Sequence, residues 1–365
     1  MLKLTWDNCP KIFIRCIFGI LLFSAADAAE DVKIVGHIDY VIKSLNPQKK
    51  EDLPIGRTLS LLSIQLSETA LRMINDRTVK AFTDSTIHLR KVDGGLVRVQ
   101  LGMNHVPVLN QGSHGTCAMF ANTAAIDAVL NKGDYISQLC ALELGRYLKN
   151  NTYTSSGWHG SWGRIILNQM AVFGLVNKAH ERLNGCAGLT EYPLEGPDPL
   201  EELSLSDYHQ MSEPIPQHLI NWTSILDPYR IVFNQPGMNK IVDDVKRALN
   251  EGDRMTFGIL LIDFNQGTVG AVGTYHTHHD SWVLTSEIAS HVHEQTKFAA
   301  HAMIITGYDD NAIAMDDQGR QYQGLFTLRN SWGSTMGDSG DFYMTYDYFK
   351  AFTLEVERLR HLGTA

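Results

Sequence analysis

Cysteine and basic charge are both scarce in this 365-residue sequence. Five cysteines are too few to hold a chain of this length together, so its stability must come from a hydrophobic core, and the hydrophobic share of 44% is ordinary for a globular protein. The 31 lysines and arginines are outnumbered by 40 aspartates and glutamates. The resulting formal net charge of −9 argues against nucleic acid or an anionic membrane surface as a partner.

The N-terminus has the pattern of an export signal. Lys3 and Lys11 precede an apolar run at residues 12–23, and a small-x-small cleavage pattern follows at residues 26–28. The run is too short to cross a bilayer, so residues 1–28 are predicted to be a secretory signal peptide, with a signal anchor as the alternative. We therefore expect a secreted or periplasmic protein, or one in a lysosome-like compartment if its source is eukaryotic, without stable membrane association after signal removal.

A glycine-rich turn brings one cysteine to the start of a helix. Gly112 and Gly115 permit backbone conformations that a Cβ would forbid, and residues 117–130 are rich in good helix formers until residues 131–133 end the pattern. Cys117 is therefore expected at a helix N-terminus, where the partial positive charge favours a thiolate over a thiol. Because the thiolate attacks carbonyl carbon, Cys117 is a candidate nucleophile.

A base for this nucleophile, and a residue to orient the base, occur far downstream. Residues 299–308 have the pattern of a buried strand that carries His301, and residues 325–333 have that of a second strand ending in Asn330-Ser331-Trp332-Gly333. Together with the glycine-rich turn, these stretches resemble the papain-like (C1-type) cysteine peptidases. The resemblance follows the chain in order over roughly residues 100–350.

The resemblance implies a role for each motif residue. Gln111, six residues before the nucleophile, falls on the oxyanion-hole side chain; His301 falls on the general base; and Asn330 falls on the residue that holds the imidazole. Trp332 falls on the indole that shields this hydrogen bond. The implied reaction is peptide hydrolysis through a thioester between the substrate and Cys117, with polypeptides as substrates and without a cofactor or metal.

The sequence also departs from the family pattern. His114 replaces a cysteine that usually forms a disulfide next to the active site, and Ala118 replaces the aromatic residue that usually follows the nucleophile. His301 comes 184 residues after Cys117, a separation that implies insertions. The wall of the cleft is therefore expected to be built differently.

Four small residues are expected to contact substrate. Gly157 and Gly160 lie in a loop rich in glycine, serine and tryptophan, where the family binds the unprimed side of the substrate backbone; a simple lead into the following helix is the alternative. Ala300 and Ala302 flank His301, and their small apolar side chains suggest a pocket for a hydrophobic side chain.

The predicted fold class is α+β, with two papain-like lobes and a groove between them in a peptidase domain at residues 96–365. Helices come first, in a lobe at about residues 110–235, and antiparallel strands forming a barrel-like lobe follow at about residues 236–350. The segment with seven of the eleven prolines, residues 193–236, is expected to be mostly irregular.

Residues 29–95 are not needed by such a domain and are predicted to be a propeptide that inhibits its own enzyme. Alternating apolar residues from Val32 and a second strand over residues 59–66, with a bulge at residues 61–62, predict a β-hairpin. Ser67 can cap a short helix ending near Asn75. A permanent accessory subdomain is the alternative.

Two further features leave alternatives open. Signal removal would leave Cys117, Cys140 and Cys186, of which the last two form either one disulfide or two free buried thiols. The insertion at residues 267–297 carries five histidines, but their spacing lacks a zinc motif, so we expect no metal and suggest that the loop narrows one end of the cleft.

Two other functions use the same residues or the same fold. An acyl transferase or amidase with the papain fold would use the same thiol and imidazole and differ only in the acceptor of the acyl group. A non-catalytic peptide-binding module would keep the groove but lose a catalytic residue. All the expected positions are filled here, so we expect an exported cysteine peptidase that is made as an autoinhibited zymogen.

Overall fold

The structure is a computed structural model that describes most of the chain after the predicted signal peptide. The described residues are 31–41, 57–84, 96–153, 156–199, 201–230, 237–262, 280–295, 297–316 and 318–363. The signal peptide predicted at residues 1–28 lies outside them, as does much of the histidine-rich insertion. Among the helices that are described, none is both long and apolar enough to cross a membrane.

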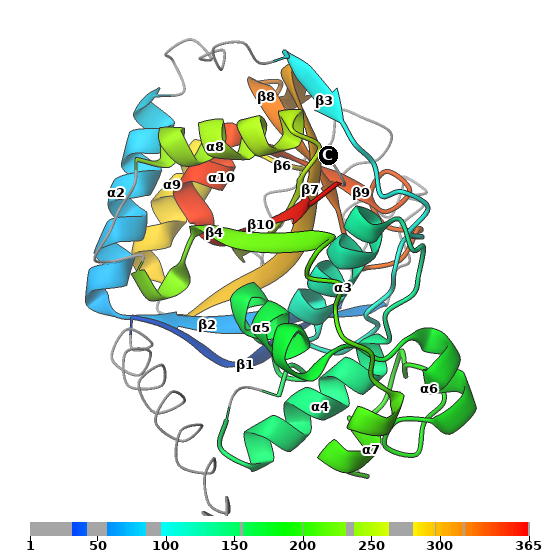
Figure 1. Ribbon diagram of the computed structural model, residues 1–365. Helices are drawn as coiled ribbons and strands as arrows, with labels where there is room; N and C mark the ends of the chain where they lie inside the picture. Colours follow the sequence, from blue (N-terminus) through cyan, green and yellow to red (C-terminus); the bar gives the residue numbers. More distant parts are fainter. Residues whose placement is uncertain are drawn as a thin grey trace, which may run out of the picture.

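The described chain is a mixed α+β protein, as predicted, with helices first and most of the sheet afterwards (Figure 1). The first group of helices comprises α3 (Cys117–Leu130), α4 (Gln138–Asn150), α5 (Gly163–Phe173), α6 (Lys178–Asn184) and α7 (Leu205–Met211). Helix α3 is buried on nearly all sides, which explains why its sequence is mostly apolar and not amphipathic. It ends at Asn131 in the left-handed conformation, as its sequence predicted.

Most strands join one sheet in the order β4-β10-β5-β7-β8-β9-β6, in which neighbours are antiparallel except for β6 and β9. These strands are β4 (Ile220–Leu226), β5 (Arg254–Leu261), β6 (Ser281–Trp282), β7 (Lys297–Met315), β8 (Gln321–Arg329), β9 (Asp341–Thr345) and β10 (Thr353–His361). The long strand β7 also pairs with β3 (Arg98–Gln100). Helix α3 packs against β7, β5 and β10, so its N-terminus lies close to the centre of the sheet (Figure 1).

The remaining helices cover the other side of the sheet (Figure 1). They are α2 (Glu68–Asp84), α8 (Met238–Asn250), α9 (Ser286–His291) and α10 (Tyr346–Phe352), with short 3₁₀ turns at Pro228–Arg230 and Val292–Glu294. Helix α2 comes from the N-terminal segment, yet it contacts both α9 and α10. Its buried Arg77 donates a hydrogen bond to the backbone oxygen of Thr353, at 3.1 Å.

The N-terminal segment forms the predicted hairpin and then extends further than predicted. Strands β1 (Val32–Val41) and β2 (Thr58–Leu66) are antiparallel, but the irregularity lies in β1 between Ile34 and Gly36 and not at residues 61–62. Helix α2 runs to Asp84 instead of ending near Asn75, because buried residues continue into its last two turns. Strand β2 also pairs with β7, so the hairpin is continuous with the main sheet.

Two other expectations are settled by the described residues. The proline-rich stretch is more regular than predicted, because α7 and β4 form between its prolines and β4 pairs with β10. Cys140 and Cys186 form a disulfide with Cα atoms 5.3 Å apart, which ties α4 to the turn after α6. Cys117 is the free cysteine of the described residues, and it is buried.

Candidate active site

Helix α3 presents Cys117 to strand β7. The preceding turn requires glycine at residue 112, which has a φ of 60° and approaches the carbonyl group of Leu194 so closely that a Cβ would overlap it. The backbone N–H groups of Ala302 and Ala118 hydrogen-bond to the sulfur. Since Ala302 follows His301 on β7, the thiol and the predicted base lie beside each other, and both residues are fully buried.

The imidazole of His301 is held by Asn330 and covered by Trp332. His301 Nε2 lies 2.7 Å from Asn330 Oδ1, and the indole of Trp332 stacks on the imidazole with ring centroids 4.4 Å apart. The amide oxygen can only accept, so Nε2 carries the proton and Nδ1 has a free lone pair. Nδ1 makes no hydrogen bond within the described part of the chain. The ring is thus fixed at one nitrogen and available for a proton at the other.

Gln111 is fully buried and connects three parts of the chain. Its Oε1 accepts a hydrogen bond from the Ser331 hydroxyl at 2.7 Å. Its Nε2 donates to the carbonyl oxygen of His114 at 2.8 Å and to that of Ser60 at 3.3 Å. Ser60 belongs to β2, so a backbone carbonyl of the N-terminal hairpin already occupies the donor that was predicted to hold an oxyanion.

The hairpin also fills the space beside the predicted substrate-binding residues. Leu62 of β2 pairs with Ala300 next to the imidazole. Its side chain lies over Gly160, where an added Cβ would be only 2.5 Å from Leu62 Cδ2. Gly157 instead faces the helical core, because a Cβ there would be 3.0 Å from the Leu142 side chain. Gly160 and Ala300 are therefore in contact with the hairpin, and contact between Gly157 and substrate stays a prediction.

Burial reverses the electrostatics that were expected from the helix N-terminus. Loss of solvent raises the pKa of the Cys117 thiol to about 12, although backbone N–H groups act in the opposite direction. Loss of solvent also lowers the pKa of His301 to about 4. The expected depression of the thiol pKa is thus wrong for this covered form, in which the thiol and the imidazole are both neutral at pH 7.

The wall of the cleft has a different construction from the family pattern, as His114 suggested. The His114 Nδ1 atom lies 3.2 Å from Asp198 Oδ1, and its ring meets the edge of Trp158 at 5.2 Å. Tyr192 stacks on Trp158 with ring centroids 5.8 Å apart. Sequence reasoning assigned no role to Asp198, Trp158 or Tyr192; Asp198 lies in the proline-rich stretch and Trp158 in the loop rich in glycine, serine and tryptophan, and neither pattern indicates these contacts.

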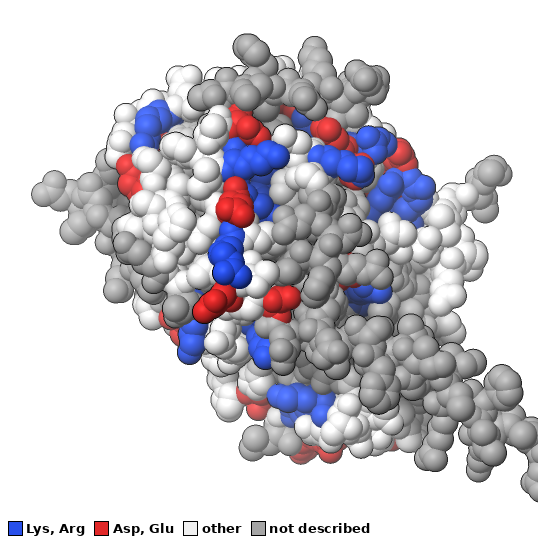
Figure 2. All heavy atoms as spheres, turned by 90° about the vertical axis from the view of Figure 1, so that its left-hand side faces the viewer, with Lys and Arg blue, Asp and Glu red and all other residues white. Residues whose placement is uncertain are grey.

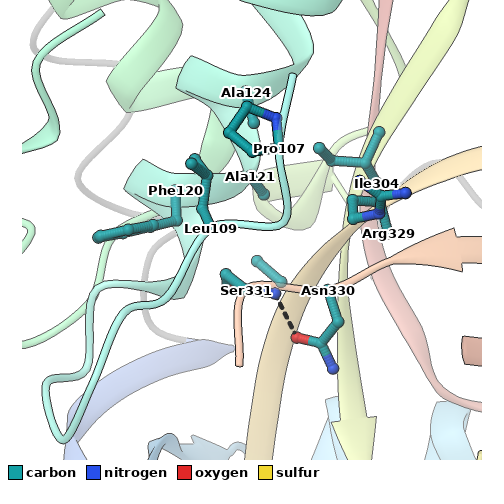
Figure 3. Close-up of a pocket in the computed structure, with 10 residues that line it drawn as sticks. Pro107, Leu109, Phe120, Ala121, Ala124, Ile304, Arg329, Asn330 and Ser331 are labelled. Atoms are coloured by element: carbon teal, nitrogen blue, oxygen red, sulfur yellow. Dashed lines mark hydrogen bonds between the residues drawn. The ribbon is translucent and has the colours of Figure 1, made fainter. Parts of the chain in front are cut away.

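A small pocket lies behind the site, between α3 and the strands β7 and β8 (Figure 3). Its cavity volume is only about 10 Å³, and it is lined by Pro107, Leu109, Phe120, Ala121, Ala124, Ala302, Ile304, Arg329, Asn330 and Ser331. Figure 3 shows Phe120 and Leu109 on one side and Ser331 and Asn330 on the other. Cys117 and His301 do not line it, whereas Ala302, Asn330 and Ser331 of the site do.

The histidine-rich insertion is only partly described. His291 and His293 lie in the described residues, whereas His276, His278 and His279 lie outside them. Within the described ranges, no three histidine, cysteine or acidic side chains come together as a metal site would require.

Comparison with known proteins gives one family match and a set of similar structures. No curated protein sequence matches the chain. Xylellain, a cysteine protease from Xylella fastidiosa, is 18% identical over 74% of this chain and 87% of its own, with a TM-score of 0.46. The cysteine protease and lectin-like domains of Cwp84 from Clostridium difficile are 16% identical over 82% of this chain and 60% of their own, with a TM-score of 0.48.

A third similar structure is digestive procathepsin L 3 from the larval midgut of Tenebrio molitor, which is 16% identical over 74% of this chain and 70% of its own, with a TM-score of 0.43. The family match covers residues 218–361, which include β5, β7, β8 and β10 and hence His301, Asn330 and Trp332. Over these residues the chain is similar to the Peptidase C1-like family.

Proposed function

We propose that this protein is an exported cysteine peptidase, made as a zymogen, that hydrolyses peptide bonds through Cys117, His301 and Asn330. The observation that supports this most directly is the imidazole of His301: Asn330 holds it at Nε2, its Nδ1 has no hydrogen-bond partner in the described residues, and the backbone N–H of the next residue, Ala302, bonds to the Cys117 sulfur. A structural histidine in a core normally has both nitrogens bonded, because an unpaired buried nitrogen is costly.

The reaction begins when the hairpin leaves the cleft and solvent or substrate enters. His301 Nδ1 takes the thiol proton, and the thiolate of Cys117 attacks the substrate carbonyl carbon. The Nε2 group of Gln111 and the Cys117 backbone N–H donate to the oxyanion, and His301 then protonates the leaving amine. Water hydrolyses the thioester and frees the thiol. Proton transfer by the imidazole is worth roughly 10²–10⁴-fold in rate, and each oxyanion donor roughly 10²–10³-fold.

The N-terminal segment at residues 29–95 is the inhibitor of this zymogen. Its strand β2 places the Ser60 carbonyl on Gln111 and the Leu62 side chain over Gly160, where a substrate would have to lie. The aliphatic Leu62 also supports a subsite for a hydrophobic side chain next to Ala300. Residues 1–28 act as the signal peptide, and residues 96–365 form the peptidase domain.

The function is tested by labelling the full-length protein with an epoxide-type thiol inhibitor, before and after limited proteolysis, and locating the adduct by mass spectrometry. We expect little labelling before proteolysis and labelling of Cys117 afterwards, together with hydrolysis of a peptide substrate. The variants C117A and H301A should abolish hydrolysis. An adduct elsewhere, or none after the hairpin is removed, would point to a peptide-binding module, and amine incorporation in place of hydrolysis would assign an acyl transferase.

A further inference from the structure

The hydroxyl of Tyr192 connects the two ends of the turn that carries both predicted oxyanion donors. It donates a hydrogen bond to the backbone oxygen of Gln111 at 2.8 Å, and it lies 2.9 Å from the hydroxyl of Thr116. A phenol has a single proton, which the Gln111 carbonyl uses, so Thr116 donates to the Tyr192 oxygen. One hydroxyl thus holds Gln111 and the residue immediately before Cys117.

This contact changes how α3 begins. Thr116 is the N-cap residue of α3, and a threonine at this position normally accepts a hydrogen bond from an N–H group in the first turn. Here the Thr116 side chain makes no capping hydrogen bond, because its hydroxyl is directed to Tyr192. The backbone N–H of Cys117 is therefore not taken by a side-chain cap; with that of Ala118 it is directed at the Cys117 sulfur, where negative charge develops in the proposed reaction.

The ring of Tyr192 is itself held in place by aromatic neighbours. It stacks on Trp158 with an interplanar angle of 6°, and it meets Phe120 edge-on at 4.8 Å and His114 edge-on at 5.8 Å. Burial raises the pKa of Tyr192 well above its usual value, so the hydroxyl keeps its proton at any pH at which the protein functions. These contacts occupy the wall of the cleft beside His114.

We propose that Tyr192 is a positioning residue of the oxyanion hole: its hydroxyl sets the separation between Gln111 and the Cys117 N–H and keeps the latter uncapped. The inference rests on the proposed function, since it assigns a role in the same reaction. Tyr192 touches neither the substrate nor the sulfur, and it acts through the turn at residues 111–116. The Tyr192 hydroxyl therefore stabilises the negatively charged intermediate and does not contribute to substrate binding.

The substitution Y192F tests this, because it removes the hydroxyl and keeps the ring. We expect kcat to fall about 10- to 100-fold with little change in KM, somewhat less than the roughly 10²–10³-fold loss that follows deletion of an oxyanion donor itself. Affinity for a peptide aldehyde, whose adduct with Cys117 places an oxygen in the oxyanion hole, should fall by a similar factor. Alkylation of the processed enzyme by iodoacetamide does not use that hole, so its rate should not change.

A matched control is Y208F. The Tyr208 hydroxyl is also buried in the helical region and donates to a backbone oxygen, that of Gly174, at 3.0 Å, but it does not contact the turn. Y208F should lower the melting temperature and leave kcat and aldehyde affinity per folded molecule unchanged. T116V removes the other half of the contact, so Y192F and T116V should be non-additive when combined.

The outcomes separate the inference from the proposed function. If the wild type, once processed, hydrolyses peptides but Y192F matches Y208F in kcat and aldehyde affinity, Tyr192 is only a packing residue and the inference is wrong. If the processed wild type neither hydrolyses peptides nor reacts at Cys117, the proposed function fails and the role of Tyr192 fails with it. A selective loss of kcat and aldehyde affinity in Y192F supports both.

Discussion

The reactivity of Cys117 depends on what covers it. A thiol at a helix N-terminus is normally acidified by the helix dipole and by nearby N–H groups, and such groups are present here. In the covered form, the loss of solvent outweighs them and the thiol stays protonated. In the proposed zymogen, the N-terminal hairpin therefore covers the site and also keeps the thiol of Cys117 protonated.

This argument predicts how alkylation of Cys117 depends on pH. Because the thiol pKa is raised to about 12, iodoacetamide should react slowly with the full-length protein at pH 7, and the rate should keep rising up to the alkaline limit of stability. After proteolytic removal of the hairpin, the rate should be much higher at pH 7 and should level off at a lower pH. Second-order rate constants for alkylation, measured against pH on both forms with C117A as the blank, test this prediction. Identical pH profiles for the two forms would contradict it.

A second prediction at this scale concerns Asn330. Its amide oxygen fixes the proton on His301 Nε2, so N330A should leave the imidazole free to turn under Trp332. We expect kcat of the processed enzyme to fall roughly 10- to 100-fold, because a misdirected base lowers the population of reactive geometries. N250A removes an exposed asparagine at the end of α8 that bonds Tyr308, and it serves as the control. Equal activity of the two variants would remove the orienting role.

Short sequence motifs were sufficient to predict where these side chains lie. Gln111, Cys117, His301 and Asn330 each have a local signature, and the structure brings them to one place. Tyr192 and Ser60 have no such signature, because each acts through contacts with residues more than 50 positions away. The sign of the thiol pKa shift was also beyond prediction, since it depends on whether the hairpin lies over the site.

At the level of elements, the N-terminal segment has two differently packed parts. Strand β2 adds to the edge of β7 through four registered residue pairs, from Leu62 with Ala300 to Gln65 with Lys297. Helix α2 packs against α10 and buries Ala70, Met73, Ile74 and Ala81. Only Ser67 separates them, and its backbone N–H and hydroxyl both bond to Asp31 at the start of β1. The hairpin is thus clamped at its open end.

Weakening β2 should release activity without proteolysis. Leu62 is buried over Gly160, so L62A should cost the covered form about 2–5 kcal/mol and raise the fraction of molecules with an open cleft. The full-length variant should therefore hydrolyse peptides and react with iodoacetamide faster than the full-length wild type. V35A changes an exposed side chain of the partner strand and should have little effect. If L62A remains as inert as the wild type, β2 is not the element that closes the cleft.

Local periodicity predicted the hairpin and most strands but not how they assemble. The alternation of apolar and polar residues from Val32 predicts a strand with one buried face. It does not indicate with which other strand this one pairs. The predicted helix after Ser67 was too short because its later buried residues, including Arg77 and Thr78, are polar. Their burial is set by α10, which lies more than 250 residues further along the chain.

For the whole molecule, acidic side chains outnumber basic ones by 40 to 31. On the face that Figure 2 presents, basic and acidic side chains of the described residues are interspersed. Several acids lie in the interior instead, and burial raises the pKa of Asp127, Glu143 and Glu357 to about 7 and that of Glu355 to about 8. Glu355 of β10 accepts hydrogen bonds from the N–H of Gly163, the first residue of α5, at 2.9 and 3.1 Å, so it joins a helix of the first half to the sheet.

These raised pKa values predict how stability depends on pH. In the unfolded chain the same carboxyl groups titrate near pH 4, so between about pH 4 and pH 8 the folded state holds protons that the unfolded state has released. The contribution of these groups to the free energy of unfolding is therefore complete below about pH 4 and is lost as the pH rises through 7 to 8. We expect a higher melting temperature at pH 5 than at pH 8. The melting temperature of E355Q should depend less on pH, because the glutamine cannot ionise. E191Q, which changes an exposed residue, is the control. Thermal unfolding of the full-length protein across this range measures both slopes, and an unchanged slope in E355Q would show that Glu355 does not hold its proton as its burial requires.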